Sequence, residues 1–549
     1  MAVVTFEMND IKKQIDSDKF VQLIERIGME IEEITDKSIS IDITPNRPDL
    51  LDYNGLIRAL LYMSGKLKPD QNAYRVKEGI LHVSVSKDVK RIRPYIAAMV
   101  VKDIDLSGNR LKYLIDFSEK LSDTYGRKRK KLALGIHNLD KIDIEKGLTY
   151  GASSEGKMIP LGSMQEMSFS DVLRENKKGI IYKGTISNKE GLVPFLADST
   201  NVLSAIPITN SELTKVTEST RALLVDITGT DLKTVNDTAN ILACSFIDMG
   251  AQVHQCTIDY GNSSVLTPNP NYRELRMRLY KIEAALGIRT DSSSAIALGE
   301  MMGYPGAQYG NSILLYLPPY RVDILNEQDV IEDIAIAYGY NNIVPEPIFH
   351  IISPSYASPI TKLKDFAADV ALGHGFTEEI NQVLTNEGTN FRNMNIEDFD
   401  EGRIIKVAYS KTENATMLRT SILPSLMKSL SISTNEPLPQ KVFEVGETFF
   451  IDSGKVFENV SLAMASEHSK ATFAEIKSVA ESVMGSLGIE YTIKQVKSQS
   501  FIEGRCAAVE IGGEIAGFFG EIHPKVLNNF KIEEPVTAFE ITLIKGIKY

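Results

Sequence analysis

The sequence predicts a multidomain α+β protein. Its 549 residues, 43% of them hydrophobic, are enough for the cores of about three or four domains. Helix-spaced apolar residues and short strand-like runs are interleaved along the chain, and stretches rich in proline and asparagine, LTPNPN at 266–271 and NNIVPEP at 341–347, mark boundaries. We therefore expect four parts, over residues 1–78, 79–266, 267–347 and 348–549.

Composition excludes several classes of protein. A formal net charge of −12 excludes a chain coated with basic residues, so any nucleic acid must be bound by local patches or with the help of a partner. Three scattered cysteines suit neither a disulfide framework nor a paired-cysteine zinc site. The N-terminus lacks the layout of a signal peptide, and no apolar run reaches the roughly 18 residues of a membrane span. We expect a cytoplasmic protein that does not enter a membrane.

Residues 1–78 predict a compact module of helix, strand, turn and helix. The apolar positions of 20–27 share one helical face, and a strand over 39–44 alternates isoleucine with polar residues. The strand leads into TPNRPD at 44–49, which is typical of a proline-set turn and is also open to interpretation as a recognition loop. We expect Asp49 to cap the helix that follows.

Residues 79–266 predict a mixed α+β domain. The strand-like runs LHVSVS, YIAAMVV and ALLVDIT are followed by a helix after TGTD whose apolar residues recur at helical spacing. The run RKRKK at 127–131 is the densest basic stretch of the chain. Such a run is either a solvated loop or a contact for phosphates, and charge alone leaves both interpretations open.

Four carboxylates crowd residues 320–340. Asp329, Glu332 and Asp333 recur at the i, i+3, i+4 spacing of one helical face, and Asp323 lies just upstream. In one interpretation Asp329 caps the helix, with Glu332 three residues on, and acids in the first turn complement the helix dipole. In the other, the cluster holds a hard cation such as Mg²⁺, which prefers oxygen ligands. The spacing alone does not decide between them.

Residues 348–549 predict an antiparallel sheet flanked by helices. A helix bearing Leu363, Phe366 and Val370 is followed by the short strand-like runs VFEVGETFF, AAVEI, AGFFGEI and AFEITL, separated by turns. Across the whole chain there is no Walker-type phosphate loop, no G-x-G-x-x-G after a strand, no HExxH and no G-x-S-x-G elbow. Residue patterns therefore indicate a candidate cation site but no catalytic apparatus.

Three segments, in order along the chain, resemble one protein family. They are SISIDITPNRPDLLDYNGLIRAL near the N-terminus, PPYRVDILNEQDVIEDIAIAYGYNNIVPEP in the third part, and MLRTSILPSLMKSL followed by FEVGETF in the fourth. All three are similar to the β subunits of phenylalanyl-tRNA synthetase, and the resemblance covers nearly the whole chain. The length, without an inserted oligonucleotide-binding domain or an extra C-terminal anticodon-binding domain, resembles the archaeal and eukaryotic type.

The resemblance implies a partner and a division of labour. In this family the ligase is an (αβ)2 heterotetramer, and the α subunit makes phenylalanyl-adenylate from ATP and charges tRNA(Phe). The last part of this chain would be a class II catalytic-like domain that does not perform the reaction, so we expect no aminoacylation residues here. Arg419 and Phe443-Glu444 resemble the strand-loop-strand that grips ATP elsewhere, but no G-x-G-x-x-x-R segment follows. We therefore expect Arg419 to serve folding or the contact with α.

The resemblance also implies that residues 79–266 form an editing domain. In this family that domain hydrolyses the ester that links mischarged tyrosine to tRNA(Phe). A pocket built for phenylalanine cannot strongly reject a near-isostere that adds a hydroxyl, so a second site improves fidelity. IPITNSELTKVTEST and VDITGTD resemble the pocket-lining segments, and Asn210, Ser211 and Asp231 are the editing residues that we expect. The alternatives are a simple turn at Asn210-Ser211 and a helix cap at Asp231.

The family further implies a Mg²⁺ site at the contact with α, in a small helical, winged-helix-like domain at 267–347. Asp323, Asp329, Glu332 and Asp333 match its ligands. The expected function is that of a phenylalanine–tRNA ligase β subunit that supports ATP-dependent charging and edits tyrosyl-tRNA. A free-standing editing hydrolase and a structural tRNA-binding scaffold are the alternatives.

Overall fold

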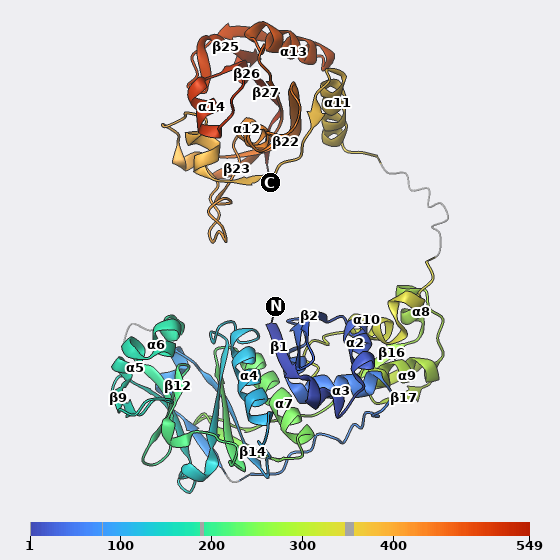
Figure 1. Cartoon of the computed structure of the whole chain (residues 1–549), viewed down its shortest axis with the longest axis vertical. Helices are drawn as coiled ribbons and strands as arrows, with labels where there is room; N and C mark the ends of the chain where they lie inside the picture. The colour runs from blue at the N-terminus through green and yellow to red at the C-terminus, as the bar shows by residue number, and fades with distance from the viewer. Residues whose placement is uncertain (1, 80, 187–190, 346–355, 549) are drawn as a thin grey trace. The chain divides into compact units, whose positions relative to one another are not determined.

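The chain forms two compact units, Met1–Pro347 and Ile348–Tyr549, each with its own sheets and cores (Figure 1). The computed structural model describes residues 2–79, 81–186, 191–345 and 356–548. The division falls at the predicted start of the fourth part. None of the helices in these ranges combines the length and the apolar character that crossing a membrane requires.

The first unit begins with a small module built on an antiparallel sheet in the order β1-β3-β2. β3 takes the central place because Ile39, Ile41 and Ile43 alternate into the core. The predicted helix and strand are confirmed, but the predicted cap is wrong: Asp52, not Asp49, accepts a hydrogen bond from the Gly55 amide at 3.1 Å. The elements are β1 (Ala2–Glu7), α1 (Met8–Lys12), α2 (Ser17–Arg26), β2 (Glu30–Ile34), β3 (Ser38–Ile43), the 3-10 turn η1 (Pro48–Leu51) and α3 (Tyr53–Met63).

The middle domain, residues 79–266, is built on one mixed sheet, and Figure 1 shows α4 and α7 between this sheet and the N-terminal module. The strand order within the described residues is β12-β11-β10-β7-β4-β14-β5-β13-β6, with β15 paired to β14. Its strands are β4 (His82–Val85), β5 (Tyr95–Lys102), β6 (Leu132–Asn138), β7 (Leu148–Ser153), β10 (Val193–Ala197), β11 (Val202–Ala205), β12 (Thr209–Asn210), β13 (Ala222–Gly229), β14 (Gln252–Asp259) and β15 (Ser264–Thr267). Its helices are α4 (Arg110–Asp123), α5 (Phe169–Glu175), α6 (Lys177–Tyr182) and α7 (Leu232–Asp248), and a small ribbon joins β8 (Lys157–Met158) to β9 (Met167–Ser168).

The third part combines three helices with a small antiparallel sheet in the order β16-β18-β17. Its elements are β16 (Arg273–Arg278), α8 (Tyr280–Leu286), α9 (Ser292–Met301), β17 (Gly306–Tyr309), β18 (Ser312–Leu317) and α10 (Glu327–Tyr338). One hydrophobic core runs through this part, the N-terminal module and the α7 side of the middle domain. The predicted boundaries at 78 and 266 therefore divide the chain inside one compact unit.

The second unit is a sheet with helices packed on both faces, as the sequence predicts. Its strand order in the described chain is β19-β22-β23-β27-β26-β25-β24, antiparallel except that β19 runs parallel to β22. α12 and α14 pack in one core, and α11 and α13 in another. The elements are α11 (Pro359–Gly373), β19 (Thr377–Glu378), β20 (Leu384–Thr385), β21 (Met417–Leu418), α12 (Leu423–Ile432), β22 (Gln440–Asp452), β23 (Lys455–Glu467), α13 (Phe473–Ser486), β24 (Thr492–Gln495), β25 (Phe501–Ile511), β26 (Glu514–Ile522), α14 (Pro524–Phe530) and β27 (Val536–Lys548).

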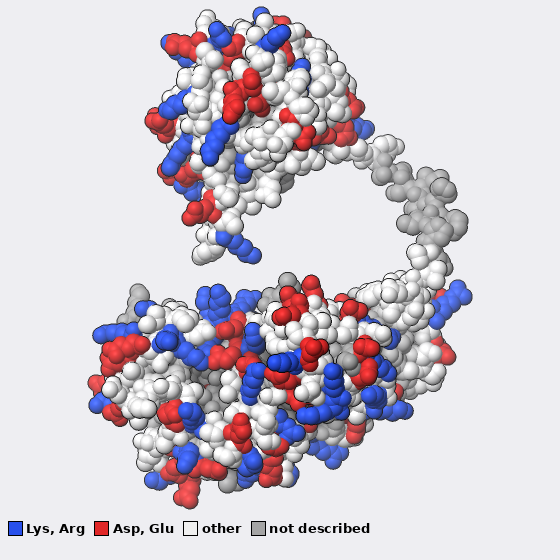
Figure 2. Space-filling model, in the orientation of Figure 1, with Lys and Arg blue, Asp and Glu red and all other residues white. Residues whose placement is uncertain are grey.

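Charge is mixed over the surface. Figure 2 shows Lys and Arg interspersed with Asp and Glu on the visible faces of both units, with no face occupied by one sign alone. The faces in this view therefore carry no broad basic field, and a contact with a polyanion there must be local.

Candidate functional site

A cavity of about 330 Å³ lies in the middle domain. It lies between α4, the strands β6 and β13, and the segment 204–216, and its walls are mainly apolar. A volume of this size is at the small end of the roughly 300–1,000 Å³ that ligand sites occupy. The cavity therefore suits one amino-acid side chain better than a large cofactor.

A buried carboxylate lies at the wall of this cavity. β13 turns Val225 and Ile227 towards the core that contains α7, so Asp226 and Thr228 face the opposite side of the sheet. Asp226 pairs in register with Gly135 of β6, and a Cβ at Gly135 would lie only 2.8 Å from the Asp226 Cγ. The Asp226 carboxylate can therefore occupy this position only because residue 135 has no side chain.

Asp226 is the last member of a buried chain of hydrogen bonds, Thr214–His137–Asp226, which we call the relay. Its Oδ1 is 3.0 Å from Nε2 of His137, and Nδ1 of the same ring is 2.7 Å from the Thr214 hydroxyl. All three side chains are at most 2% exposed. The neutral tautomer in which Nε2–H donates to Asp226 and Nδ1 accepts from Thr214 satisfies both contacts. The relay fixes one carboxylate oxygen of a group that lines the cavity.

Two further features supply polar groups near the cavity. Arg93 is buried, which lowers its pKa to about 10, and its Nε donates to the Thr228 hydroxyl at 3.0 Å. The hydroxyl of Ser204, which also lines the cavity, is buried without a hydrogen-bond partner in the described structure. An unpartnered buried hydroxyl costs free energy unless a ligand or water satisfies it. Ser204 is therefore suited to recognise a polar group on a ligand.

The rim of the cavity holds an ion cluster around Glu119. Burial alone would raise the pKa of Glu119, but a hydrogen bond from Lys178 and the charge of Arg129 hold it below its ordinary value. The Arg129 guanidinium also donates to the backbone oxygens of Pro207 and Ile208, at 3.0 and 3.1 Å. This cluster ties α4 and α6 to the segment that closes the cavity.

The structure brings two of the three predicted editing residues to this cavity. Asn210 and Ser211 line it, with Asn210 Nδ2 donating to the Ile136 oxygen at 3.1 Å. Asp231 lies elsewhere: its carboxylate caps α7 by accepting from the Thr234 amide at 2.8 Å, and it lines a different hollow. The helix-cap alternative is therefore the one that the geometry supports for Asp231.

Sequence reasoning missed His137, Asp226 and Thr228. One signal was present, since Asp226 and Thr228 are polar residues two apart in the otherwise apolar strand ALLVDIT and so must share a face. His137 gave no such signal, because its partners are 77 and 89 residues away in the sequence.

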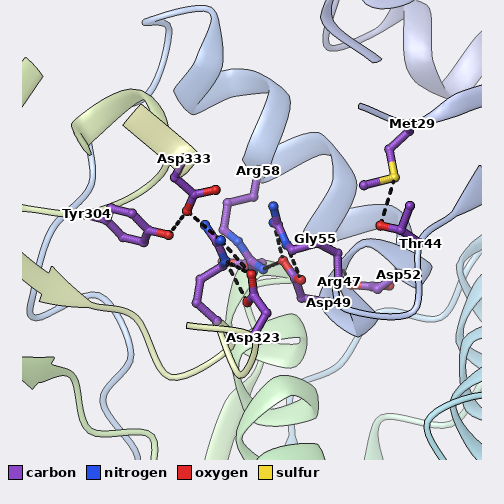
Figure 3. A network of polar contacts seen from close by, with 12 residues as sticks. Met29, Thr44, Arg47, Asp49, Asp52, Gly55, Arg58, Tyr304, Asp323 and Asp333 are labelled. Atoms are coloured by element: carbon purple, nitrogen blue, oxygen red, sulfur yellow. Dashed lines mark hydrogen bonds and ion pairs between the residues drawn. The ribbon is translucent and has the colours of Figure 1, made fainter. Parts of the chain in front are cut away.

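The four predicted metal ligands do not converge on one point. The Arg321 guanidinium lies between two of them, with NH2 2.7 Å from Asp323 and 2.6 Å from Asp333, and Asp333 also accepts from the Tyr304 hydroxyl (Figure 3). Burial alone would raise the pKa of Asp323, but the charge of Arg321 holds it below its ordinary value. The chain's own cation thus occupies the place between these two carboxylates.

The other two acids serve the start of α10 or face solvent. Asn326 is the N-cap, and Asp329 completes a capping box by accepting from the Leu325 and Asn326 amides at 2.7 and 2.9 Å. The cap interpretation makes Asp329 the N-cap with Glu332 three residues on, but Glu332 is exposed and takes no part in the capping box, which Asn326 and Asp329 form. Among the residues that the structure describes, no group of three or more His, Cys, Asp or Glu side chains is arranged to hold a metal ion. The four acids of this chain do not by themselves fit Mg²⁺, and the predicted site stays a prediction.

The TPNRPD motif belongs to the same buried network (Figure 3). Arg47 binds both carboxylate oxygens of Asp49, at 2.9 and 2.8 Å, and Arg58 lies 3.8 Å from Asp49. Arg58 also pairs with Asp248 of α7 and stacks on the Tyr320 ring at 3.6 Å. The motif is therefore a structural joint between the N-terminal module, α7 and the third part, as the turn interpretation predicts.

In the second unit Arg419 and Glu444 are bonded to each other. The Arg419 NH1 lies 2.6 Å from the Glu444 carboxylate, both side chains are buried, and Arg419 Nε donates to the Glu447 oxygen. The absence of a Cβ at Gly446 makes room for this pair, because a Cβ there would lie too close to the Arg419 guanidinium. A buried, paired arginine is not available to grip a nucleotide, which agrees with the structural role expected for it.

Comparisons with known proteins agree with one another. A family model described as the phenylalanyl tRNA synthetase beta chain CLM domain matches residues 350–543, and one described as the tRNA synthetase B5 domain matches residues 275–340. The chain is 34% identical over 547 residues to the phenylalanine–tRNA ligase beta subunit of Archaeoglobus fulgidus, covering 99% of this chain and 98% of the relative. It is 34% identical over 560 aligned residues to that of Methanocaldococcus jannaschii, covering 99% and 100%.

A solved structure also resembles the chain. The crystal structure of an N-terminal fragment of the phenylalanyl-tRNA synthetase beta subunit from Pyrococcus horikoshii matches with a TM-score of 0.58 and 29% sequence identity. The match covers 61% of this chain and 99% of the fragment.

Proposed function

Because the chain belongs to the family of phenylalanine–tRNA ligase β subunits, we propose that its middle-domain cavity hydrolyses tyrosyl-tRNA(Phe), while an α subunit performs the charging reaction. The observation that carries the editing proposal is the Thr214–His137–Asp226 relay, which ends at a small apolar cavity. The relay supplies a carboxylate that can act as an acid or a base. In the second unit, by contrast, Arg419 is not available for charging, because it is buried and paired with Glu444.

The geometry supports direct attack by water. Hydrolysis of an aminoacyl ester needs a water molecule held beside the ester carbonyl and a base to take its proton, and no covalent nucleophile. His137 holds Oδ1 of Asp226, which leaves Oδ2 to orient and deprotonate the water. The developing negative charge on the ester oxygen would be stabilised by the side-chain amide of Asn210, whose Nδ2 carries a second N–H besides the one that donates to the Ile136 oxygen.

Selection between tyrosine and phenylalanine follows from the apolar walls and the buried Ser204 hydroxyl. The walls accept either aromatic ring, but only tyrosine brings a phenol that can satisfy Ser204. A site that hydrogen-bonds a substrate hydroxyl discriminates strongly against the analogue that lacks it, because its own polar group is then left unpaired. Cognate phenylalanyl-tRNA would therefore be spared.

The test is coexpression with the candidate α subunit, followed by sizing, aminoacylation and deacylation assays. We expect an (αβ)2 assembly that charges tRNA(Phe) and clears tyrosyl-tRNA, whereas this chain alone forms no phenylalanyl-adenylate. Asp226→Asn should abolish deacylation and leave charging intact. Asp231→Asn is the matched control, because it makes the same change at a carboxylate that lies outside the cavity. Deacylation that survives Asp226→Asn would refute the mechanism.

The same experiment separates the alternatives. A free-standing editing hydrolase would deacylate fully without α, and a structural scaffold would bind tRNA without deacylating it. The three cysteines of the described chain are all free and buried, which suits the cytoplasm that we propose as its location.

Mg²⁺ has no step in this mechanism. If a cation binds at α10, Glu332 is the one of the four predicted ligands that is exposed and outside the contacts of Arg321 and the capping box, and the partner must supply further ligands. Titration with Mn²⁺ followed by electron paramagnetic resonance checks this: we expect binding to the αβ complex and none to this chain alone. Loss of the bound signal in Glu332→Gln would support the assignment, and an unchanged signal would remove Glu332 from it.

A further inference from the structure

The basic turn, residues 127–131, has an unusual backbone. Arg127, Lys128 and Arg129 follow one another at φ angles of 50, 53 and 62°, in the left-handed region that favours glycine. Backbone bonds hold it there, from the Lys128 amide to the Asp123 oxygen at 2.8 Å and from the Arg129 amide to the Ser122 oxygen at 2.9 Å. The turn is a fixed, strained element and not a loose loop.

The side chains of the turn divide into one anchor and an exposed set. Arg129 points inward to the cavity wall, and its own backbone oxygen accepts from Arg93 at 3.0 Å. Arg127, Lys128 and Lys130 are exposed, and the ion pairs of the turn in the described chain are confined to Arg129. The buried anchor therefore holds three uncompensated positive charges at a fixed position beside the cavity.

The left-handed backbone of the turn does not by itself explain why its residues are basic. Glycine or asparagine would adopt the left-handed backbone at lower cost, yet the chain keeps long basic side chains at these positions. Two of the basic residues, Arg127 and Lys131, also line a hollow of about 680 Å³ between the middle domain and the N-terminal module, together with Lys233 and the acidic residues Asp123 and Asp231. The hollow thus carries three basic and two acidic side chains, a small local excess of positive charge next to the exposed turn in a chain of net charge −12.

We propose that the basic turn binds the phosphates of the RNA strand whose aminoacylated 3′ end enters the cavity. The inference rests on the proposed editing function. Side chains of lysine and arginine bind phosphates without reading sequence, and a rigid turn places them at a defined distance from the reacting ester. The turn would thereby position the 3′ end, while Arg129 keeps the turn in register with the cavity wall.

The decisive measurement is the salt dependence of binding to the αβ complex. The probe is labelled tRNA(Phe) with tyrosine attached to its terminal ribose through an amide, which cannot be hydrolysed as an ester. The triple variant Arg127→Gln, Lys128→Gln and Lys130→Gln should bind roughly tenfold more weakly and lower the slope of log Kd against log salt by about two.

Matched controls isolate the contact. Lys87, Lys90 and Arg91 are also exposed basic residues of the middle domain, and they line neither hollow. Changing these three to glutamine should leave the slope as in the wild type. An unchanged slope in the 127–130 variant, or an equal loss in both triple variants, would overturn the inference. Release of α with an unchanged tRNA slope would also overturn it, since the turn would then contact a protein.

A single substitution tests the strain argument. Lys128→Gly relieves a left-handed lysine, so it should raise the urea midpoint of unfolding and at the same time weaken binding of the probe. Stabilisation without weaker binding would overturn the inference. The proposed function fails separately, if the wild-type complex never deacylates tyrosyl-tRNA.

Discussion

Gly135→Ala is the sharpest test of the geometry of the proposed editing site. A Cβ at position 135 would lie 2.8 Å from the Asp226 Cγ and 2.9 Å from His137 Nε2. An ordinary contact begins at 3.4 Å, so the Cγ must retreat by about 0.6 Å, the difference from 2.8 Å, and the nearer carboxylate oxygen by more. Because a misplacement of about 1 Å can cost roughly 100-fold in rate, we expect kcat for deacylation of tyrosyl-tRNA to fall by about that factor.

The assay compares deacylation with charging in the αβ complex. The overpacked strand pair should lose about 1–3 kcal/mol of unfolding free energy, and charging should be unchanged. Gly184→Ala is the control, because a Cβ there meets nothing within 4 Å and the backbone is not left-handed. Wild-type deacylation by a folded Gly135→Ala complex would refute the placement of Asp226 as the reacting carboxylate.

Three further predictions concern stability. Asp231→Ala removes the α7 cap and should cost about 1 kcal/mol in urea unfolding without lowering kcat for deacylation, and a fall in kcat would restore its editing role. Arg321→Met leaves two buried aspartates without their cation and should cost about 3–5 kcal/mol, so a loss below about 1 kcal/mol would contradict the pairing. The pKa of Glu119 is lower in the folded protein than its ordinary value of 4.5, so ionised Glu119 stabilises the fold at pH values above 4.5. This stabilisation is lost as the pH falls from 4.5 through the lowered pKa of the folded state. Glu119→Gln should therefore flatten unfolding free energy against pH below 4.5, and an unchanged slope would contradict it.

Local patterns predicted much of the secondary structure. Apolar spacing predicted the N-terminal helix and its strand, and the apolar runs of the fourth part predicted its sheet, because period and burial are local properties of the sequence. Capping was less certain. Asp49 and Asp52 both precede α3. In the structure Asp49 pairs with Arg47, two residues before it, whereas Asp52 caps the helix and also accepts from the Ser245 hydroxyl of α7, a contact that no local pattern predicts.

The candidate site was predictable only in part. Asn210 and Ser211 came from a local resemblance and do line the cavity, whereas Asp231 satisfied a pattern that a helix cap explains equally well. The His137 relay depends on strand pairing across about 90 residues, which no local pattern encodes. The arrangement of the four acids was not predictable for a similar reason, since Arg321 adjoins them in sequence but its position between Asp323 and Asp333 follows from folding.

Two of the three segments that resemble the family, one in the N-terminal module and one in the third part, meet at one buried joint (Figure 3). Arg47–Asp49 and Arg321–Asp323 meet there with Arg58, within a few side chains of one another. Buried ion pairs add little net stability over well-packed apolar residues, but separating them leaves uncompensated charges at high cost. The joint therefore adds little to the free energy of unfolding of the unit. Its main effect is that other arrangements of the N-terminal module and the third part would cost much free energy. We therefore expect the middle-domain cavity and the third part to keep a constant distance from each other and to move as one body.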